Sequence, residues 1–187
     1  NNHYPSGWAM ASNTPFRRFK QNTHAGGISD PLVVHWPAGF GDRGQIRPQF
    51  CHVVDFTPTV LDVVGIAAPA LFRGIEQQPI AGVSFAHTFA DGAAPTRKQA
   101  QYFEMFGSRG IWADGWKAVT YHQPDSGGDF DSDQWELYKI DDDWAEANDL
   151  AAAEPDKLRE LIDLWWLEAE ANGVLPLDDR RDTLPWG

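Results

Sequence analysis

Three cations and a pair of glycines stand close together between residues 13 and 31. The cations are Arg17, Arg18 and Lys20, and Gly26-Gly27 follows just before an apolar run. A cation on a loop that a rigid sheet positions can neutralise an anion whose charge develops on non-bridging oxygens. From spacing alone, the alternative that these cations are ordinary surface charges stays open and is favoured. If any segment of the chain carries chemistry, it is this one.

Histidine and cysteine usage argues against a metal site built by this chain alone. The six histidines form no H-x-H or H-x-x-x-H pair, which are common spacings of zinc ligands. His24 differs from the others, because it lies in a glycine-flanked loop four residues after Lys20. Cys51 is the only cysteine, which excludes an internal disulfide, and its apolar surroundings favour a buried structural thiol over a nucleophile.

An acidic segment in the second half has part of a calcium-loop pattern. Asp129, Asp131 and Asp133 have the required spacing, but Gln134 replaces the glycine of such a loop and Ile140 replaces its final glutamate. We therefore expect a solvated acidic loop here and no metal ligand in the chain.

The first half predicts a strand and a helix joined by loops. Residues 1–27 show no sustained period and are expected to form a loop. The apolar run 31–37, bounded by prolines, is typical of a strand buried on both faces, as in parallel sheets. Residues 57–65 begin with Thr-Pro and end on Gly65, which predicts a helix that starts there or at Asp55. Residues 66–96 are expected to be a connecting segment.

The second half predicts an antiparallel sheet and one long helix. Asp114-Gly115 separates two strand-like runs, which is a strong hairpin signal. The four expected strands are 101–105, 109–113, 116–121 and 134–140. A helix with an apolar stripe is expected from Pro155 to about Asn172, ending before Gly173 and packing on one face of the sheet.

Composition excludes several classes of partner. The 187 residues carry a net charge of −12, with 42% hydrophobic and 13% aromatic residues, so a packed core is expected. No Lys/Arg-rich run is present, which argues against nucleic acid as a partner. No apolar stretch is long enough for a membrane helix. The chain does not begin with Met, so we expect upstream sequence and leave localisation open between bacterial cytoplasm and periplasm.

Several motifs resemble those of the sulfatase family. Lys20 followed by Ala25-Gly26-Gly27-Ile28, Pro31 and Trp36-Pro37 looks like the motif in which a lysine precedes Glu-Gly-Gly and a strand. Residues 52–61, HVVDFTPTVL, resemble the family's H-x-x-D-x-x-P-T-x-L helix. Later landmarks follow in the same order, namely GVSF at 82–85, GWK at 115–117, WELY at 135–138 and NDL at 148–150. The similarity covers nearly the whole chain and is closest to bacterial arylsulfatases.

The resemblance implies an α/β fold of the alkaline-phosphatase superfamily and places this chain at its C-terminal end. Residues 1–96 would end the large catalytic α/β domain, and residues 97–187 would form a smaller domain of about four antiparallel strands and a helix. The parent would hydrolyse sulfate esters, with a formylglycine hydrate attacking sulfur and a calcium ion holding the sulfate. The segment around Cys51 does not match the motif C-x-(P/A/S)-x-R that yields formylglycine.

The resemblance carries one functional residue onto this chain. The family's sulfate-binding lysine corresponds to Lys20, and His24 is a candidate neighbour in the same pocket. The nucleophile and the calcium carboxylates are expected in an N-terminal catalytic portion, so the fragment alone is expected to be inactive. Ala25 departs from the pattern, since the family usually has Glu there, and this puts the geometry of the loop in question.

Two alternatives remain open. Phosphonate monoester hydrolases and phosphodiesterases share this superfamily. A non-catalytic Trp-rich module that binds sugar or protein is a further alternative, because nine tryptophans are many for 187 residues. The charge of −12 favours small aryl or alkyl sulfates over heavily sulfated glycans as substrates.

Overall fold

The computed structural model describes residues 4–39, 41 and 44–181. Within them the chain forms two compact units. One joins the segment that ends at Pro31 to the segment that begins at Ala100, and the other comprises Leu32–Gln99. The cationic segment therefore packs with the C-terminal sheet. The domain boundary expected between residues 96 and 97 concerns a longer parent and stays a prediction.

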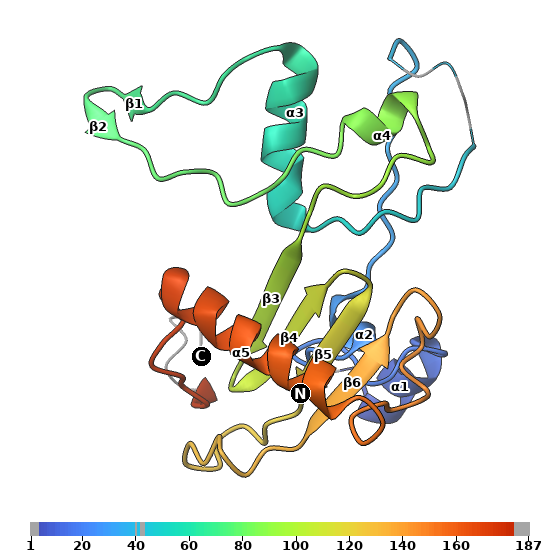
Figure 1. Ribbon diagram of the computed structural model, residues 1–187, viewed down its shortest axis with the longest axis vertical. Helices are drawn as coiled ribbons and strands as arrows, with labels where there is room; N and C mark the ends of the chain where they lie inside the picture. The colour runs from blue at the N-terminus through green and yellow to red at the C-terminus, as the bar shows by residue number, and fades with distance from the viewer. Residues whose placement is uncertain (1–3, 40, 42–43, 182–187) are drawn as a thin grey trace. The chain divides into compact units, whose positions relative to one another are not determined.

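Four antiparallel strands form the sheet of the first unit (Figure 1). They lie in chain order: β3 (Ala100–Met105), β4 (Ser108–Ala113), β5 (Trp116–Thr120) and β6 (Trp135–Lys139). Asp114 and Gly115 join β4 to β5 with φ angles of 48° and 77°. A type I′ turn requires positive φ at both of its central residues. The expected strands and hairpin are confirmed.

One long helix, α5 (Pro155–Ala171), covers one face of this sheet (Figure 1). It starts with proline and is followed by Gly173 at a φ of 69°, as the sequence signals predict. Trp165 is fully buried and donates its indole N–H to the carbonyl oxygen of Phe103 at 3.1 Å. The buried core between helix and sheet consists of Ile111, Ala118, Leu137, Leu161, Trp165 and Ala169.

The opposite face of the sheet carries polar as well as apolar side chains, and it is also covered. Successive side chains of a strand point to opposite faces. Since Ala118 and Leu137 face α5, Lys117, Glu136 and Tyr138 point the other way. Lys117 and Tyr138 are register partners, and both are buried. The amino-terminal segment supplies the cover, as its hydrogen bonds to these strands show.

The amino-terminal segment is more ordered than the sequence suggests. Residues 1–27 were expected to form a loop, but the described part contains helices α1 (Ser6–Ser12) and α2 (Ala25–Ile28). Short helices of this kind lack a periodic apolar stripe, and tertiary contacts stabilise them. In Figure 1 both helices lie on the side of the sheet away from α5.

The second unit is built around the helix that the Thr-Pro signal predicts. A 3₁₀ turn, η1 (Val53–Asp55), leads into α3 (Phe56–Val64), which ends at Gly65 with a φ of 68°. The buried carboxylate of Asp55 accepts hydrogen bonds from the backbone N–H of His52 and Val83 and from Lys98 Nζ, at 2.7 to 2.8 Å. The remaining elements are short: β1 (Leu71–Phe72), β2 (Ile75–Glu76) and α4 (His87–Ala90).

The buried strand expected at residues 31–37 is not present. The run has no strand hydrogen bonding, and the side chain of Val33 is 86% exposed. An apolar strand is stable only beside partner strands, and the described part of this unit has just one hairpin, formed by the two-residue strands β1 and β2. No helix among the described residues is long and apolar enough to cross a membrane.

The packing of α5 predicts a large stability loss for Trp165→Ala. Truncating a fully buried tryptophan leaves a cavity and removes the hydrogen bond from its indole N–H to Phe103, at a cost of about 3–5 kcal/mol. Urea denaturation of the protein measures the loss. Trp8→Ala is the matched control, since Trp8 is 66% exposed, and its change is expected within about 0.5 kcal/mol. Equal losses in the two variants would contradict the assigned core.

Candidate functional site

The cationic loop folds so tightly that its two glycines are needed. A Cβ atom at Gly26 would lie 2.3 Å from the carbonyl oxygen of Arg17, and one at Gly27 would lie 2.0 Å from that of Asn22. The Asn13 side chain closes the loop by donating to the carbonyl oxygens of Arg18 and Gly26, at 2.8 and 2.6 Å. The Gly-Gly pair thus serves close backbone packing at the end of the loop.

Of the three cations on this loop, only Lys20 is not engaged elsewhere in the described structure. Arg17 forms an ion pair with Glu136 at 2.6 Å. The Arg18 guanidinium lies 3.9 Å from the ring centroid of Tyr121, a cation–π contact. Lys20 is exposed, and its ammonium has no hydrogen bond or ion pair to any described residue. The loop therefore presents one uncompensated positive charge to solvent.

The sheet holds the loop through its backbone as well as its side chains. Thr23 is buried, and its hydroxyl donates to the carbonyl oxygens of Arg109 at 3.0 Å and Thr120 at 3.3 Å. Arg109 and Thr120 are register partners on β4 and β5, so one hydroxyl bridges two strands. Gly110 permits this approach, because a Cβ there would lie 3.2 Å from Thr23 Cβ.

Glu136 is the centre of a first polar cluster between loop and sheet. It accepts from Arg17 Nη1, from the Tyr138 hydroxyl and, at 3.3 Å, from His24 Nε2. Burial alone would raise the pKa of Glu136, but the hydrogen bonds from His24, Tyr138 and Arg17 outweigh it and lower the pKa to about 2. Burial and the neighbouring carboxylate both raise the pKa of Tyr138. Glu136 is therefore a carboxylate that fastens the loop.

Glu146 is the centre of a second cluster. Its side chain is fully buried, accepts the backbone N–H of Ala25 at 2.8 Å and forms an ion pair with Lys117. Burial lowers the pKa of Lys117, and the ion pair with Glu146 opposes that shift. The amide at the start of α2 is thus fixed by a buried charge pair on the sheet side.

His24 is placed in the first cluster rather than in an open pocket. It is fully buried, and because a carboxylate can only accept, its Nε2 carries the proton donated to Glu136. Its Nδ1 is buried and has no hydrogen-bond partner among the described residues. No hydrogen bond or ion pair of the described structure joins His24 to Lys20. The roles given to Lys20 and His24 toward a substrate stay predictions.

The sequence analysis did not identify Glu136 and Glu146 as the residues that position the loop. The alternation in residues 134–140 does place Glu136 and Tyr138 on one face, so that signal was present. Glu146 lies in the turn region after β6 and carries no comparable signal.

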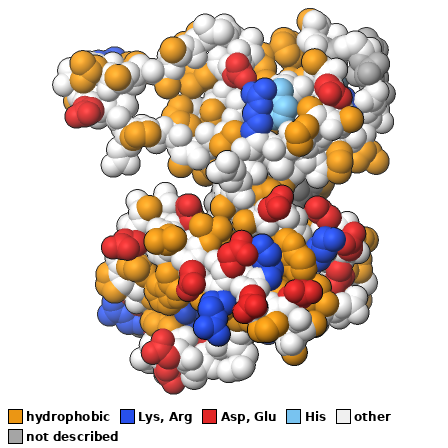
Figure 2. All heavy atoms as spheres, viewed as in Figure 1, with side chains coloured by type: hydrophobic (Ala, Val, Ile, Leu, Met, Phe, Trp, Pro, Cys, Tyr) orange, Lys and Arg blue, Asp and Glu red, His pale blue; other side chains and the backbone are white. Residues whose placement is uncertain are grey.

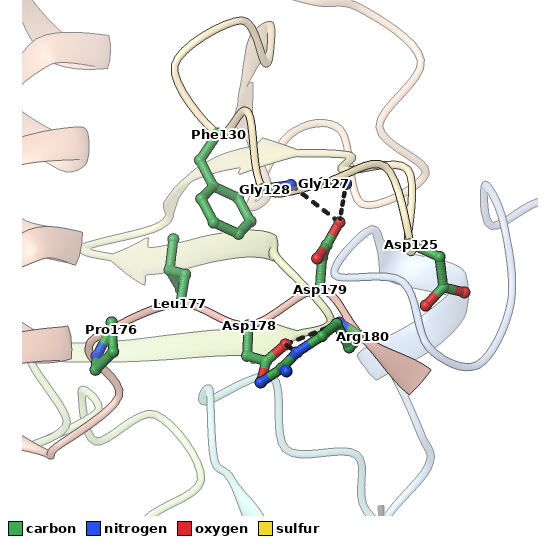
Figure 3. A pocket seen from close by; sticks show the side chains of 9 residues that line it. All are labelled: Asp125, Gly127, Gly128, Phe130, Pro176, Leu177, Asp178, Asp179 and Arg180. Carbon is green, nitrogen blue, oxygen red and sulfur yellow. Dashed lines mark hydrogen bonds and ion pairs between the residues drawn. The ribbon is translucent and has the colours of Figure 1, made fainter. Parts of the chain in front are cut away.

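A second candidate site lies at the loop of residues 125–130 and the segment of residues 176–180, which line a pocket (Figure 3). His122 contacts Ser126 Oγ at 3.1 Å and Asp133 at 2.9 Å, an order that resembles a catalytic triad. However, the Asp179 carboxylate accepts from the amides of Ser126 and Gly127 at 2.8 and 3.1 Å and lies 3.4 Å from His122 Nε2. An imidazole between two carboxylates is poorly suited to activate a serine.

This cluster also corrects the expectation of a fully solvated acidic loop. Asp129 and Asp131 are exposed, but the side chain of Asp133 is only 10% exposed and pairs with Arg109 and His122. Burial alone would raise the pKa of Asp179, yet the amide and His122 hydrogen bonds lower it. We interpret the cluster as the structural anchor of the segment after α5.

The described residues do not assemble a site for the cofactors that the family resemblance implies. The described residues contain no group of three or more His, Cys, Asp or Glu that could hold a metal ion. Cys51 is half-buried, and burial raises the pKa of its thiol, so it is not an activated nucleophile. These residues do not fit a calcium or formylglycine centre.

The Glu136 cluster predicts that loop docking weakens in acid. A carboxyl whose folded pKa is lowered adds stability above its unfolded pKa and loses it as pH falls toward the folded value. For Glu136 the window runs from about 4.5 down to about 2, and the contribution is at most about 3 kcal/mol. Unfolding measurements between pH 6 and pH 2 should show wild type and Glu136→Gln converging as pH falls. A constant difference over this range would contradict the assignment.

Known proteins place these features in one family. The family model described as the C-terminal part of N-sulphoglucosamine sulphohydrolase matches residues 17–164. An uncharacterised sulfatase of Schizosaccharomyces pombe is 32% identical over 180 residues, which cover 94% of this chain and 31% of that protein. The chain thus spans about a third of this relative's length.

Solved structures share the fold. Ps i-CgsB matches with a TM-score of 0.68 at 18% identity, over 91% of this chain and 35% of its own. A protein labelled as a 6S-sulfatase, from a glycosaminoglycan-metabolism locus of Bacteroides thetaiotaomicron, matches with a TM-score of 0.60 at 18% identity, over 82% and 31%. Both similarities confirm the expected sheet and long helix. With the family model covering most of its length, this chain belongs to the sulfatase family and corresponds to the C-terminal part that this model describes.

Proposed function

We propose that this chain is the C-terminal part of a sulfuric ester hydrolase and that its role is to present Lys20 to the sulfate group of the substrate. The observation that carries the proposal is the difference among the three loop cations. Arg17 is paired with Glu136 and Arg18 lies against Tyr121, whereas Lys20 is exposed and uncompensated. The position of Lys20 also corresponds to the sulfate-binding lysine of the family.

The chemistry of Lys20 follows from its charge. Its ammonium would bind a non-bridging sulfate oxygen and stabilise the negative charge that grows during cleavage of the ester. Such a group accelerates the reaction most when the protein holds it in place before the substrate arrives. The contacts of Arg17, Thr23 and Ala25 with the sheet unit are suited to that task.

The remaining parts of the reaction would come from the rest of the enzyme. Calcium and a formylglycine nucleophile are implied by the resemblance, and we propose that the N-terminal portion of the polypeptide holds both. The substrate ester, which we propose to be a small aryl or alkyl sulfate, would bind where that portion meets the Lys20 loop.

Surface charge supports a small substrate. The net charge is −12, and in the view of Figure 2 acidic side chains are interspersed with basic and hydrophobic ones. A polyanionic glycan would need a local basic surface to offset repulsion.

The buried tryptophans do not support the alternative of a Trp-rich binding module. Trp165 and Trp112 are buried, where packing is their ordinary role, while Trp8 and Trp144 are exposed.

The phosphodiesterase alternative is tested by assaying the full-length protein on p-nitrophenyl sulfate and on a phosphate diester. A preference for the sulfate ester supports the proposal, and a preference for the diester contradicts it.

Replacing the lysine gives the direct test. Lys20→Ala in the full-length enzyme is expected to lower kcat/KM for p-nitrophenyl sulfate by about 10²–10³-fold, the typical effect of removing one charge-stabilising group. The melting temperature should stay unchanged, because the Lys20 ammonium has no partner among the described residues. Lys139→Ala, which removes another exposed lysine of the sheet unit, serves as control and should retain activity. Wild-type turnover by Lys20→Ala would refute the role of this lysine.

A further inference from the structure

The backbone around Lys20 is held in an unfavourable conformation. Arg18 and Gln21, on either side of Lys20, have φ angles of 63° and 73°. Left-handed backbone is rare for residues other than glycine and persists where the surrounding structure enforces it. The conformation that displays Lys20 therefore depends on contacts made elsewhere.

Glu146 contacts the chain on both sides of Lys20. Its carboxylate accepts the N–H of Ala25 at 2.8 Å, five residues after the lysine. Its backbone carbonyl lies 3.5 Å from Arg17 Nη1, three residues before the lysine. Glu146 is itself left-handed, with a φ of 58°, although it is fully buried. Such strain at a buried charged residue is typical of positions that serve a site.

Lys117, on strand β5, fixes the carboxylate of Glu146. It is 3% exposed and is paired with Glu146 Oε1, while Glu146 Oε2 accepts the Ala25 amide. The two carboxylate oxygens thus connect a rigid strand to the first amide of α2. Ala25 has no side chain that could hold this part of the loop, and a carboxylate from another part of the chain binds its amide instead.

We propose that Glu146, held by Lys117, is a positioning residue for Lys20. This inference rests on the proposed function of Lys20. Misplacing a catalytic group by about 1 Å can reduce a rate by up to 10²-fold. Loss of the Glu146 contact is therefore expected to lower activity through the position of the lysine and not through loss of folded protein.

A double-mutant cycle in the full-length enzyme tests this. Glu146→Gln should lower kcat/KM for p-nitrophenyl sulfate by at least tenfold when Lys20 is present. In the Lys20→Ala background the same change should have no further effect, because the group it positions has been removed. If Glu146→Gln fails to fold with Lys117 left unpaired, Glu146→Leu combined with Lys117→Met removes both charges and the acceptor for Ala25.

Asp133→Asn is the matched control. Asp133 is a largely buried carboxylate that is also paired with a cation of the sheet, Arg109, and its partners, Arg109 and His122, lie outside the Lys20 loop. Any loss it causes through stability should be the same factor in both backgrounds. Equal losses for Glu146→Gln in both backgrounds, or no loss in either, would overturn the positioning role. Full activity of Lys20→Ala alone would instead refute the proposed function.

Discussion

The four-stranded sheet is covered on both faces, so it must bury apolar side chains on one face and pair its charged side chains on the other. The arrangement of the rest of this unit depends on this constraint. The face toward α5 is largely apolar, and burial of Ile111 and Leu137 against Trp165 of α5 stabilises it. The other face carries Lys117 and Glu136, and charged side chains are buried at low cost only when each is paired. Arg17, His24 and the Ala25 amide supply partners to this face. The loop is therefore held in place by hydrogen bonds and ion pairs to the buried charged side chains of the sheet.

This arrangement explains why a cationic loop can leave one charge free. Arg17 is paired with Glu136 and Arg18 lies against Tyr121, so both anchor the loop. Lys20 lies in the tight turn between them and the glycines, where the backbone is left-handed on both sides. Within one segment, Arg17 and Arg18 thus anchor the loop, and Lys20 is exposed to solvent. In a sulfatase, the C-terminal sheet would act as the support of a sulfate-binding group.

Local signals were sufficient to predict most of the fold. The Asp114-Gly115 turn, the alternation in residues 134–140 and the stripe of α5 each depend on neighbouring residues, and each is confirmed. The expected strand at residues 31–37 was wrong because strand formation needs partners that the described residues do not provide. Asp133 was misassigned to solvent because its partner Arg109 is 24 residues away.

The supporting residues of the site could not be predicted for the same reason. Lys20 and His24 were singled out from their own segment, but Glu136 and Glu146 reach that segment from more than 110 residues away. Short sequence windows carry no information on such pairs. The face on which Glu136 lies was predictable from strand alternation, whereas its partner was not.

The most direct measurement is a crystal structure of the full-length enzyme with sulfate bound. The account predicts that Lys20 Nζ lies within about 3 Å of a sulfate oxygen while the Glu146 carboxylate still accepts the Ala25 amide. A sulfate bound at the active centre with the Lys20 side chain directed into solvent would contradict it.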